Sequence, residues 1–285
     1  MGMNRFCICI LAGLLAAGAA RAQSAPALLI PGDAGTLALG LTREIPGDYE
    51  VVDAGISGGI WAPATASNTF LGAKVGLKLS PAFTLRLDGK YFSDKPYEIS
   101  NAQGAVTGSF APSEMFFSLG ASFNVTEQLS FGLDARVISS SLAPEAKAMG
   151  FCGDVSASYG TDKFTAVLSG RNLGPGLDYG NGASPLPSLV SLAGAVNPAD
   201  ALKLFLEADY IFSGGLMAGF GAEYGIADIA FLRAGYHYGD PAKALASYVS
   251  LGLGATFSGF SIDLAFLTAS ETLGNTLMAG LGYSF

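Results

Sequence analysis

Charge is scarce in this sequence. Only 13% of its 285 residues are charged, whereas a soluble domain usually carries about a quarter. Half of the residues are apolar, yet after the first 22 no stretch reaches the roughly 18 consecutive apolar residues that a membrane-spanning helix needs. Short apolar segments alternate instead with polar residues. This pattern predicts a barrel of strands with lipid outside and water inside.

Cysteine and metal-ligand motifs are also nearly absent. Cys7 and Cys9 lie in an N-terminal segment expected to be removed, which leaves Cys152 alone, with no partner for a disulfide or a multi-cysteine metal site. The Gly-rich stretch Asn172–Gly176 lacks the lysine and the following helix of a phosphate loop. We expect no cofactor and no metal, and we expect Cys152 to be a small inward-facing residue.

The chain has a single histidine, His237. A serine hydrolase needs a histidine between a nucleophile and a carboxylate, but no Gly-x-Ser-x-Gly motif occurs. Alternation puts Tyr236 and Tyr238 on one strand face and Arg233 and His237 on the other. The sequence therefore predicts a structural histidine and no enzyme, and a membrane hydrolase centred on His237 is the open alternative.

The N-terminus has the pattern of a secretory signal peptide. Asn4 and Arg5 precede an apolar run, Phe6–Ala20, and a small-x-small cleavage site ends at Ala22. The prediction is a signal peptide at residues 1–22 and one mature domain at 23–285, with an uncleaved anchor helix as the alternative. Cleavage leaves 13 basic against 23 acidic residues, a net charge of −10. Such an acidic protein repels nucleic acid, so no nucleic-acid partner is expected.

Period-two alternation dominates the rest of the chain and predicts strands with two different faces. It is clearest at 83–91, 129–137, 202–210 and 249–257. Weaker versions occur at 69–79, 115–125, 151–159, 164–172, 188–196, 216–224, 229–238, 260–268 and 277–285. One or two more strands are expected between Thr36 and Trp61. The predicted fold is all-β, a transmembrane antiparallel barrel of about 14 strands; a soluble β-sandwich or propeller is the alternative.

The connections between these segments fall into two kinds. Those at 79–82 and 124–128 are short, as periplasmic turns are. Those at 92–114 and 172–187 are long and rich in Gly, Pro, Ser and Asn, as surface loops are.

Charged residues fall on the polar faces of the expected strands and are candidates to line the lumen. They are Arg86, Asp88, Lys90, Asp134, Arg136, Asp154, Arg171, Lys203, Glu207, Asp209, Glu223, Arg233 and Asp263. They could form a charged pore that selects solutes, or a ladder of ion pairs that fills a closed lumen. Both signs occur on single strands, which favours the ladder.

The C-terminal strand resembles the assembly signal of bacterial outer-membrane barrels. Leu281, Tyr283 and Phe285 alternate to the last residue, with aromatic rings at the last and third-last positions. An edge strand of this kind can pair with insertion machinery before the barrel closes. The expected partners are therefore outer-membrane lipid and the barrel-assembly machinery, and the expected location is the outer membrane of a Gram-negative cell.

Several stretches resemble the PorV/PorQ family of type IX secretion barrels. They are Ala25–Ala34 followed by Leu37–Gly40, Tyr97–Glu114, Ser139–Leu142, and Arg171–Leu177 with Pro185–Pro187. Arg171-Asn172-Leu173-Gly174-Pro175 is the strongest of them. The usual Asn-Pro-Ala-Gly plug motif of the family is missing, and only Thr42–Ser67 stands in the place of that segment.

The resemblance implies a 14-stranded barrel like that of the fatty-acid transporters, in a bacterium of the Bacteroidota. It further implies a non-enzymatic accessory of type IX protein secretion that binds the translocon, the attachment complex or the C-terminal domains of cargo. The competing hypothesis is an outer-membrane channel or transporter for small or hydrophobic solutes.

Overall fold

Fourteen antiparallel strands close into a barrel in the computed structural model, which describes residues 23–46, 50–61, 68–227, 229–240 and 242–285. The barrel strands are β1 Val52–Trp61, β2 Asn68–Ser80, β3 Phe83–Ser93, β6 Ser113–Asn124, β7 Leu129–Ser141, β8 Lys147–Gly160, β9 Phe164–Leu173, β12 Leu189–Ala199, β13 Leu202–Ile211, β14 Gly215–Ile226, β15 Ala230–Gly239, β16 Tyr248–Phe257, β17 Phe260–Thr268 and β18 Thr276–Ser284. The predicted fold class is confirmed. The predicted signal peptide lies outside the described residues.

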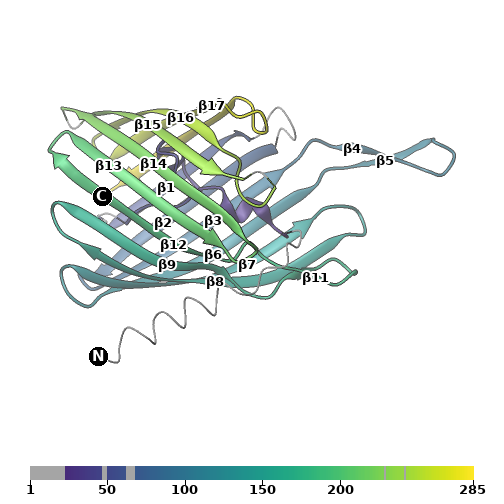
Figure 1. Cartoon of the computed structure of the whole chain (residues 1–285), viewed down its shortest axis with the longest axis horizontal. Helices are drawn as coiled ribbons and strands as arrows, with labels where there is room; N and C mark the ends of the chain where they lie inside the picture. The colour runs from purple at the N-terminus through teal and green to yellow at the C-terminus, as the bar shows by residue number, and fades with distance from the viewer. Residues whose placement is uncertain (1–22, 47–49, 62–67, 228, 241) are drawn as a thin grey trace.

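The strands run up and down around the barrel, and β1 closes it by pairing with both β2 and β18. Figure 1 shows the C-terminus at one end, where the short turns lie, and the hairpin of β4 (Tyr97–Ser100) and β5 (Val106–Phe110) projecting from the other. We call these the short-turn end and the long-loop end. The second long connection also carries a small hairpin, β10 (Leu177–Asp178) and β11 (Ala183–Ser184).

The outer wall is apolar because alternate residues of every strand point away from the lumen. Leu87 on β3, Leu133 on β7 and Leu206 on β13 are 40%, 62% and 61% exposed, although all three are large and apolar. Aromatic side chains ring the outer wall near the short-turn end. They include Phe123, Phe131, Tyr159, Phe164, Tyr224, Phe257, Phe260, Tyr283 and Phe285. An apolar band with an aromatic girdle is the surface that a bilayer requires.

Helices are few and short in this fold. None of the helices in the described part of the chain is long and apolar enough to cross a membrane.

The segment expected to hold one or two strands, Thr36–Trp61, is only partly β. Thr36 lies in a helix, α2 (Ala34–Ala38), and β1 is the only strand among the residues of this segment that the structure describes. Asp33 caps this helix, since its side chain accepts a hydrogen bond from the backbone N–H of Thr36 at 2.8 Å.

Residues 23–46 lie inside the barrel, and we call them the plug. They begin near the long-loop end with a short 3₁₀ turn, η1 (Pro26–Leu29), and continue through α2, which contacts β15–β18. The family resemblance predicts a shortened plug at Thr42–Ser67. The structure corrects this prediction, because most of the plug precedes Thr42 and residues 52–61 form β1.

Glycine on the inner wall makes room for the plug backbone. A Cβ added at Gly235 of β15 would lie 2.3 Å from the carbonyl carbon of Leu39, and one at Gly221 of β14 would lie 2.5 Å from the Leu39 oxygen. Atoms that are not bonded to each other do not approach so closely. Only glycine therefore fits at these two positions while the plug is in place.

Candidate functional site: two cavities separated by a plug

The plug separates two cavities of similar size and opposite character. The first, about 850 Å³, lies at the long-loop end and is lined by the start of the plug; we call it the upper pocket. The second, about 880 Å³, lies toward the short-turn end and is lined by plug residues 42–46 and charged wall residues; we call it the lower chamber.

The upper pocket is mainly apolar. Ala27 and Leu29 of the plug form one side, and Trp61 of β1 and Phe92 of β3 form another. All four side chains are buried. The loop residues 242–246 and Leu273 also line the pocket, and a few polar side chains, among them Gln23 and Asn68, contribute to its rim. Ligand pockets of this kind bind apolar molecules and place a few polar groups for selection.

One charged side chain is buried in the lining of the upper pocket, Glu114 at the start of β6. Its carboxylate accepts hydrogen bonds from the backbone N–H of Ala27 at 3.4 Å and from the Ser140 hydroxyl at 3.3 Å. The hydroxyl of Tyr179, on the loop between β10 and β11, donates to Ser140 at 2.8 Å. This chain of contacts connects the pocket, the plug and a long loop.

The plug is anchored near its C-terminal end, at Thr42, by a buried charged cluster. Glu207 accepts from the backbone N–H of Thr42 at 2.6 Å and from its hydroxyl at 2.8 Å. Arg171 donates to the same hydroxyl at 2.7 Å and lies 3.5 Å from Glu207 and 3.9 Å from Asp209. Both carboxylate side chains are 1% exposed. Buried charges of this kind are stable only when they are paired and hydrogen-bonded.

Two further contacts hold the adjoining turn of the plug. The Ser250 hydroxyl donates to the carbonyl oxygen of Ala38 at 2.9 Å, and Nδ1 of His237 lies 3.1 Å from the carbonyl oxygen of Gly40. The His237 ring is fully buried and stacks on Tyr248. Among the described residues, no serine hydroxyl and no carboxylate hydrogen-bonds to this ring. The geometry is that of a structural histidine, and no hydrolase triad forms around it.

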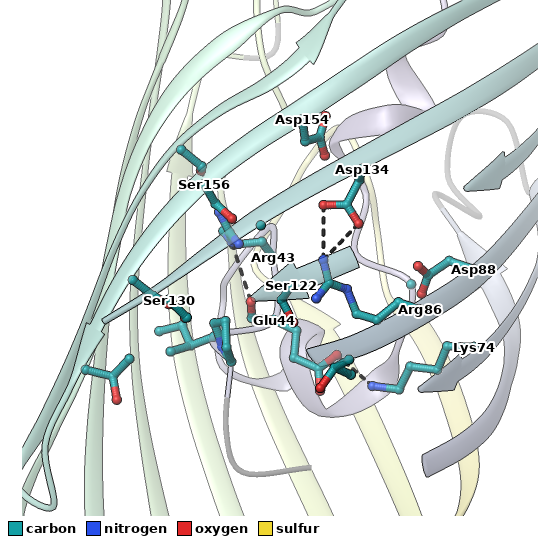
Figure 2. A pocket seen from close by; sticks show the side chains of 18 of the residues that line it. Arg43, Glu44, Lys74, Arg86, Asp88, Ser122, Ser130, Asp134, Asp154 and Ser156 are labelled. Atoms are coloured by element: carbon teal, nitrogen blue, oxygen red, sulfur yellow. Dashed lines mark hydrogen bonds and ion pairs between the residues drawn. The ribbon is translucent and has the colours of Figure 1, made fainter. Parts of the chain in front are cut away.

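The lower chamber is lined by alternating charges (Figure 2). Arg86 of β3 and Asp134 of β7 lie 2.9 Å apart, and their dashed contacts span the wall in the figure. Lys74 of β2 reaches across to Glu44 of the plug at 2.7 Å. Oppositely charged neighbours on this wall therefore neutralise one another.

The end of the plug carries two ionisable groups whose pKa is shifted by the enclosure. Desolvation inside the lumen raises the pKa of the Glu44 carboxyl, although half of its side chain is exposed to the chamber, and the Lys74 ammonium opposes that shift. Burial also lowers the pKa of the Arg43 guanidinium, and the positive charge of Arg171 lowers it further. Arg43 donates to the Ser169 hydroxyl on β9.

The structure places the predicted lumen charges on the inner wall and pairs most of them. The pairs and clusters are Arg86 with Asp134, Arg136 with Asp154, Arg171 with Glu207 and Asp209, and Arg233 with Glu223 and Asp263, with Lys203 at 4.0 Å from Glu223. Asp88 lines the lower chamber, and Lys90 donates to the carbonyl oxygen of Ile30 at 2.7 Å. This arrangement is the one expected of an ion-pair ladder.

Cys152 is 4% exposed and points inward next to Arg136, as predicted. The described residues contain no cluster of His, Cys, Asp and Glu suited to a metal ion. The C-terminal residues Tyr283 and Phe285 contact each other on the outer wall, and their role in assembly stays a prediction.

Two parts of the site carry little signal in the sequence: Glu114 of the upper pocket, and the plug residues Thr42 and Arg43 that line the lower chamber. Glu114 was assigned to the preceding loop, although Glu114, Phe116 and Ser118 alternate inward at the start of β6. Thr42 and Arg43 were missed because the plug has no strand periodicity. The alternation beginning at Glu114 was the one signal that could have found part of the site.

Fold and site together define a class, a closed 14-stranded barrel with an internal plug between an apolar pocket and a charged chamber. The fold of the chain is similar to that of toluene transporters. The Ralstonia pickettii toluene transporter TbuX matches with a TM-score of 0.62 and 12% identity, over 90% of this chain and 98% of that one. The Pseudomonas putida toluene transporter TodX matches at 0.55 and 14%, over 95% and 96%. The monoaromatic hydrocarbon channel CymD matches at 0.56 and 14%, over 84% and 89%.

No protein-family model and no curated protein matches the sequence. At identities this low, the structural likeness establishes the fold.

Proposed function

We propose that this protein is an outer-membrane channel for hydrophobic solutes, with its long-loop end outside the cell. The observation that carries the proposal is the upper pocket. An apolar cavity of about 850 Å³ opens among the long loops and ends on the apolar start of the plug. Burial of apolar surface in such a pocket is worth about 25 cal/mol per Å², enough to hold a small hydrocarbon. The fold shared with hydrocarbon transporters supports this proposal.

The ion-pair ladder and the plug fit the same function. A lower lumen lined by charged side chains disfavours passage of an apolar solute along the axis. Uptake then requires a change in the plug, whose contacts with the wall are distributed over the middle and lower lumen.

Uptake of radiolabelled toluene tests the proposal. Gram-negative cells with an intact lipopolysaccharide layer, which hydrocarbons cross slowly, should take up toluene faster when they contain the protein. The variant Leu245→Asp puts a charge into the pocket and should abolish the gain. Equal uptake with and without the protein, at equal amounts in the outer membrane, would contradict the proposal.

The role as an accessory of type IX secretion stays a prediction. Its sequence motifs lie mainly in the plug and in the two long connections, and these connections would face the outside in the proposed orientation. Affinity purification from outer membranes should recover translocon components or cargo if that role is correct. Recovery of neither would count against it.

A further inference from the structure

A buried carboxylate in an apolar pocket implies selection by charge. Glu114 is 8% exposed and lines the upper pocket, where the other charged lining residues, Asp94 and Lys243, are less buried and come from the loops. A ligand that fills the apolar part of the pocket comes within reach of this side chain.

The hydrogen bonds that Glu114 accepts leave part of the acceptor capacity of its carboxylate unoccupied. An ionised carboxylate offers about four acceptor positions, whereas this one receives two hydrogen bonds at 3.3 and 3.4 Å, near the upper limit for such bonds. The nearby Lys90 ammonium attracts it electrostatically, but the hydrogen bonds of that ammonium go elsewhere. Lys90 directs its ammonium to the carbonyl oxygens of Ile30 at 2.7 Å and Ala27 at 3.5 Å.

The consequence for a ligand depends on the polar group that it carries. A hydroxyl or an ammonium group donates to the free acceptor positions of Glu114, and a hydrogen bond to a charged group is stronger than one between neutral groups. A carboxylate brings a second negative charge into the same poorly solvated site and is repelled.

We propose that the upper pocket selects apolar compounds carrying a hydroxyl or amine donor and rejects those carrying a carboxylate, with Glu114 as the specificity-determining residue. This inference rests on the proposed function, since it assumes that the pocket binds apolar solutes. It divides the hydrophobic solutes into a favoured class, such as ring alcohols and ring amines, and a disfavoured class, such as fatty and ring carboxylic acids.

Fluorescence of Trp61 provides the test. It is the chain's single tryptophan and it lines the upper pocket. Purified protein in amphipol is titrated with methylcyclohexane, cyclohexanol, cyclohexylamine and cyclohexanecarboxylate, which do not absorb at the excitation wavelength of tryptophan. For each ligand the readout is the ratio of its affinity for the wild type to its affinity for Glu114→Gln, so that differences in partitioning cancel.

The wild type should bind cyclohexylamine and cyclohexanol about tenfold more tightly than Glu114→Gln does, and should bind the carboxylate more weakly than the variant does. Glu98→Gln, the same change on the β4–β5 hairpin outside the pocket, should leave all four affinities unchanged. Ratios near one for the amine, the alcohol and the carboxylate, with methylcyclohexane bound, would overturn the selectivity and leave the channel standing. The same holds if Glu98→Gln reproduced the effect.

Failure of the wild type to bind methylcyclohexane would have a wider consequence than the loss of selectivity. It would remove the proposed function together with the selectivity. If Glu114→Gln failed to fold, the wild type would still decide: a carboxylate bound as tightly as the amine at equal partitioning would overturn the inference.

Discussion

The upper pocket and the lower chamber have nearly the same volume but are built by opposite means. The upper pocket is lined by buried apolar side chains from the plug, β1, β3 and the loops, with a single buried carboxylate. The lower chamber is lined by side chains of alternating charge from the barrel wall. The plug forms part of both linings. Under the proposed function, solute recognition belongs to the loops and the start of the plug, whereas the wall charges neutralise one another around the lower chamber.

The largest effect is expected where the plug meets the wall. Arg171→Met leaves the carboxylates of Glu207 and Asp209 buried without their cation, which costs about 3–5 kcal/mol. Urea unfolding of the purified barrel measures the loss. The matched control is Lys203→Met, because that lysine is 51% exposed and lies 4.0 Å from Glu223, and it should cost less than about 1 kcal/mol. Equal losses in the two variants would show that the buried cluster does not anchor the plug.

The next effect concerns the fit between plug and glycine. Gly235→Ala places a Cβ 2.3 Å from the carbonyl carbon of Leu39, and overpacking of this kind costs about 1–3 kcal/mol. The fraction of molecules with a displaced plug should rise about tenfold, and channel openings in planar bilayers should become correspondingly more frequent. Gly55→Ala on β1 is the control, because its Cβ has its nearest neighbour at 3.5 Å. An increase in both variants would refute the proposed fit.

Removal of an aromatic wall should weaken the upper pocket without changing the lower chamber. Trp61→Ala should lower the affinity for radiolabelled toluene about threefold to tenfold, since aromatic contacts contribute beyond the area that they bury. Phe131→Ala, on the outer aromatic girdle, should leave the affinity unchanged. Toluene affinity that is insensitive to Trp61→Ala would place the binding site elsewhere.

The smallest effect is expected in the lower chamber. Glu44→Gln removes the ion pair with Lys74, whose side chains are 50% and 38% exposed, so the barrel should lose less than about 1 kcal/mol of stability. Toluene uptake should be unchanged. If Glu44→Gln reduced toluene uptake as strongly as Leu245→Asp does, the two cavities would not differ in function as proposed.

The barrel could be predicted from the sequence because successive residues of a transmembrane strand face lipid and lumen in turn, so that apolar and polar residues alternate along it. The alternation at 83–91 and 202–210 predicts both the strand and the face that meets lipid, and the structure agrees. The plug could not be predicted in this way. The polar groups of the plug form hydrogen bonds with residues that are distant in the sequence, as the backbone N–H of Thr42 does with Glu207 of β13. Such contacts leave no periodic pattern in the sequence of the plug. The upper pocket could not be predicted for the same reason, because residues far apart in the sequence, such as Trp61 and Leu273, line it together only in the closed barrel.

Equilibrium binding of radiolabelled toluene to the purified protein tests the central claim most directly, with Ala244→Trp as the variant that fills the upper pocket from its loop side. We expect one saturable site in the wild type, retained in Glu44→Gln and lost in Ala244→Trp. Binding that does not saturate, or that survives Ala244→Trp unchanged, would contradict an apolar pocket that receives the solute.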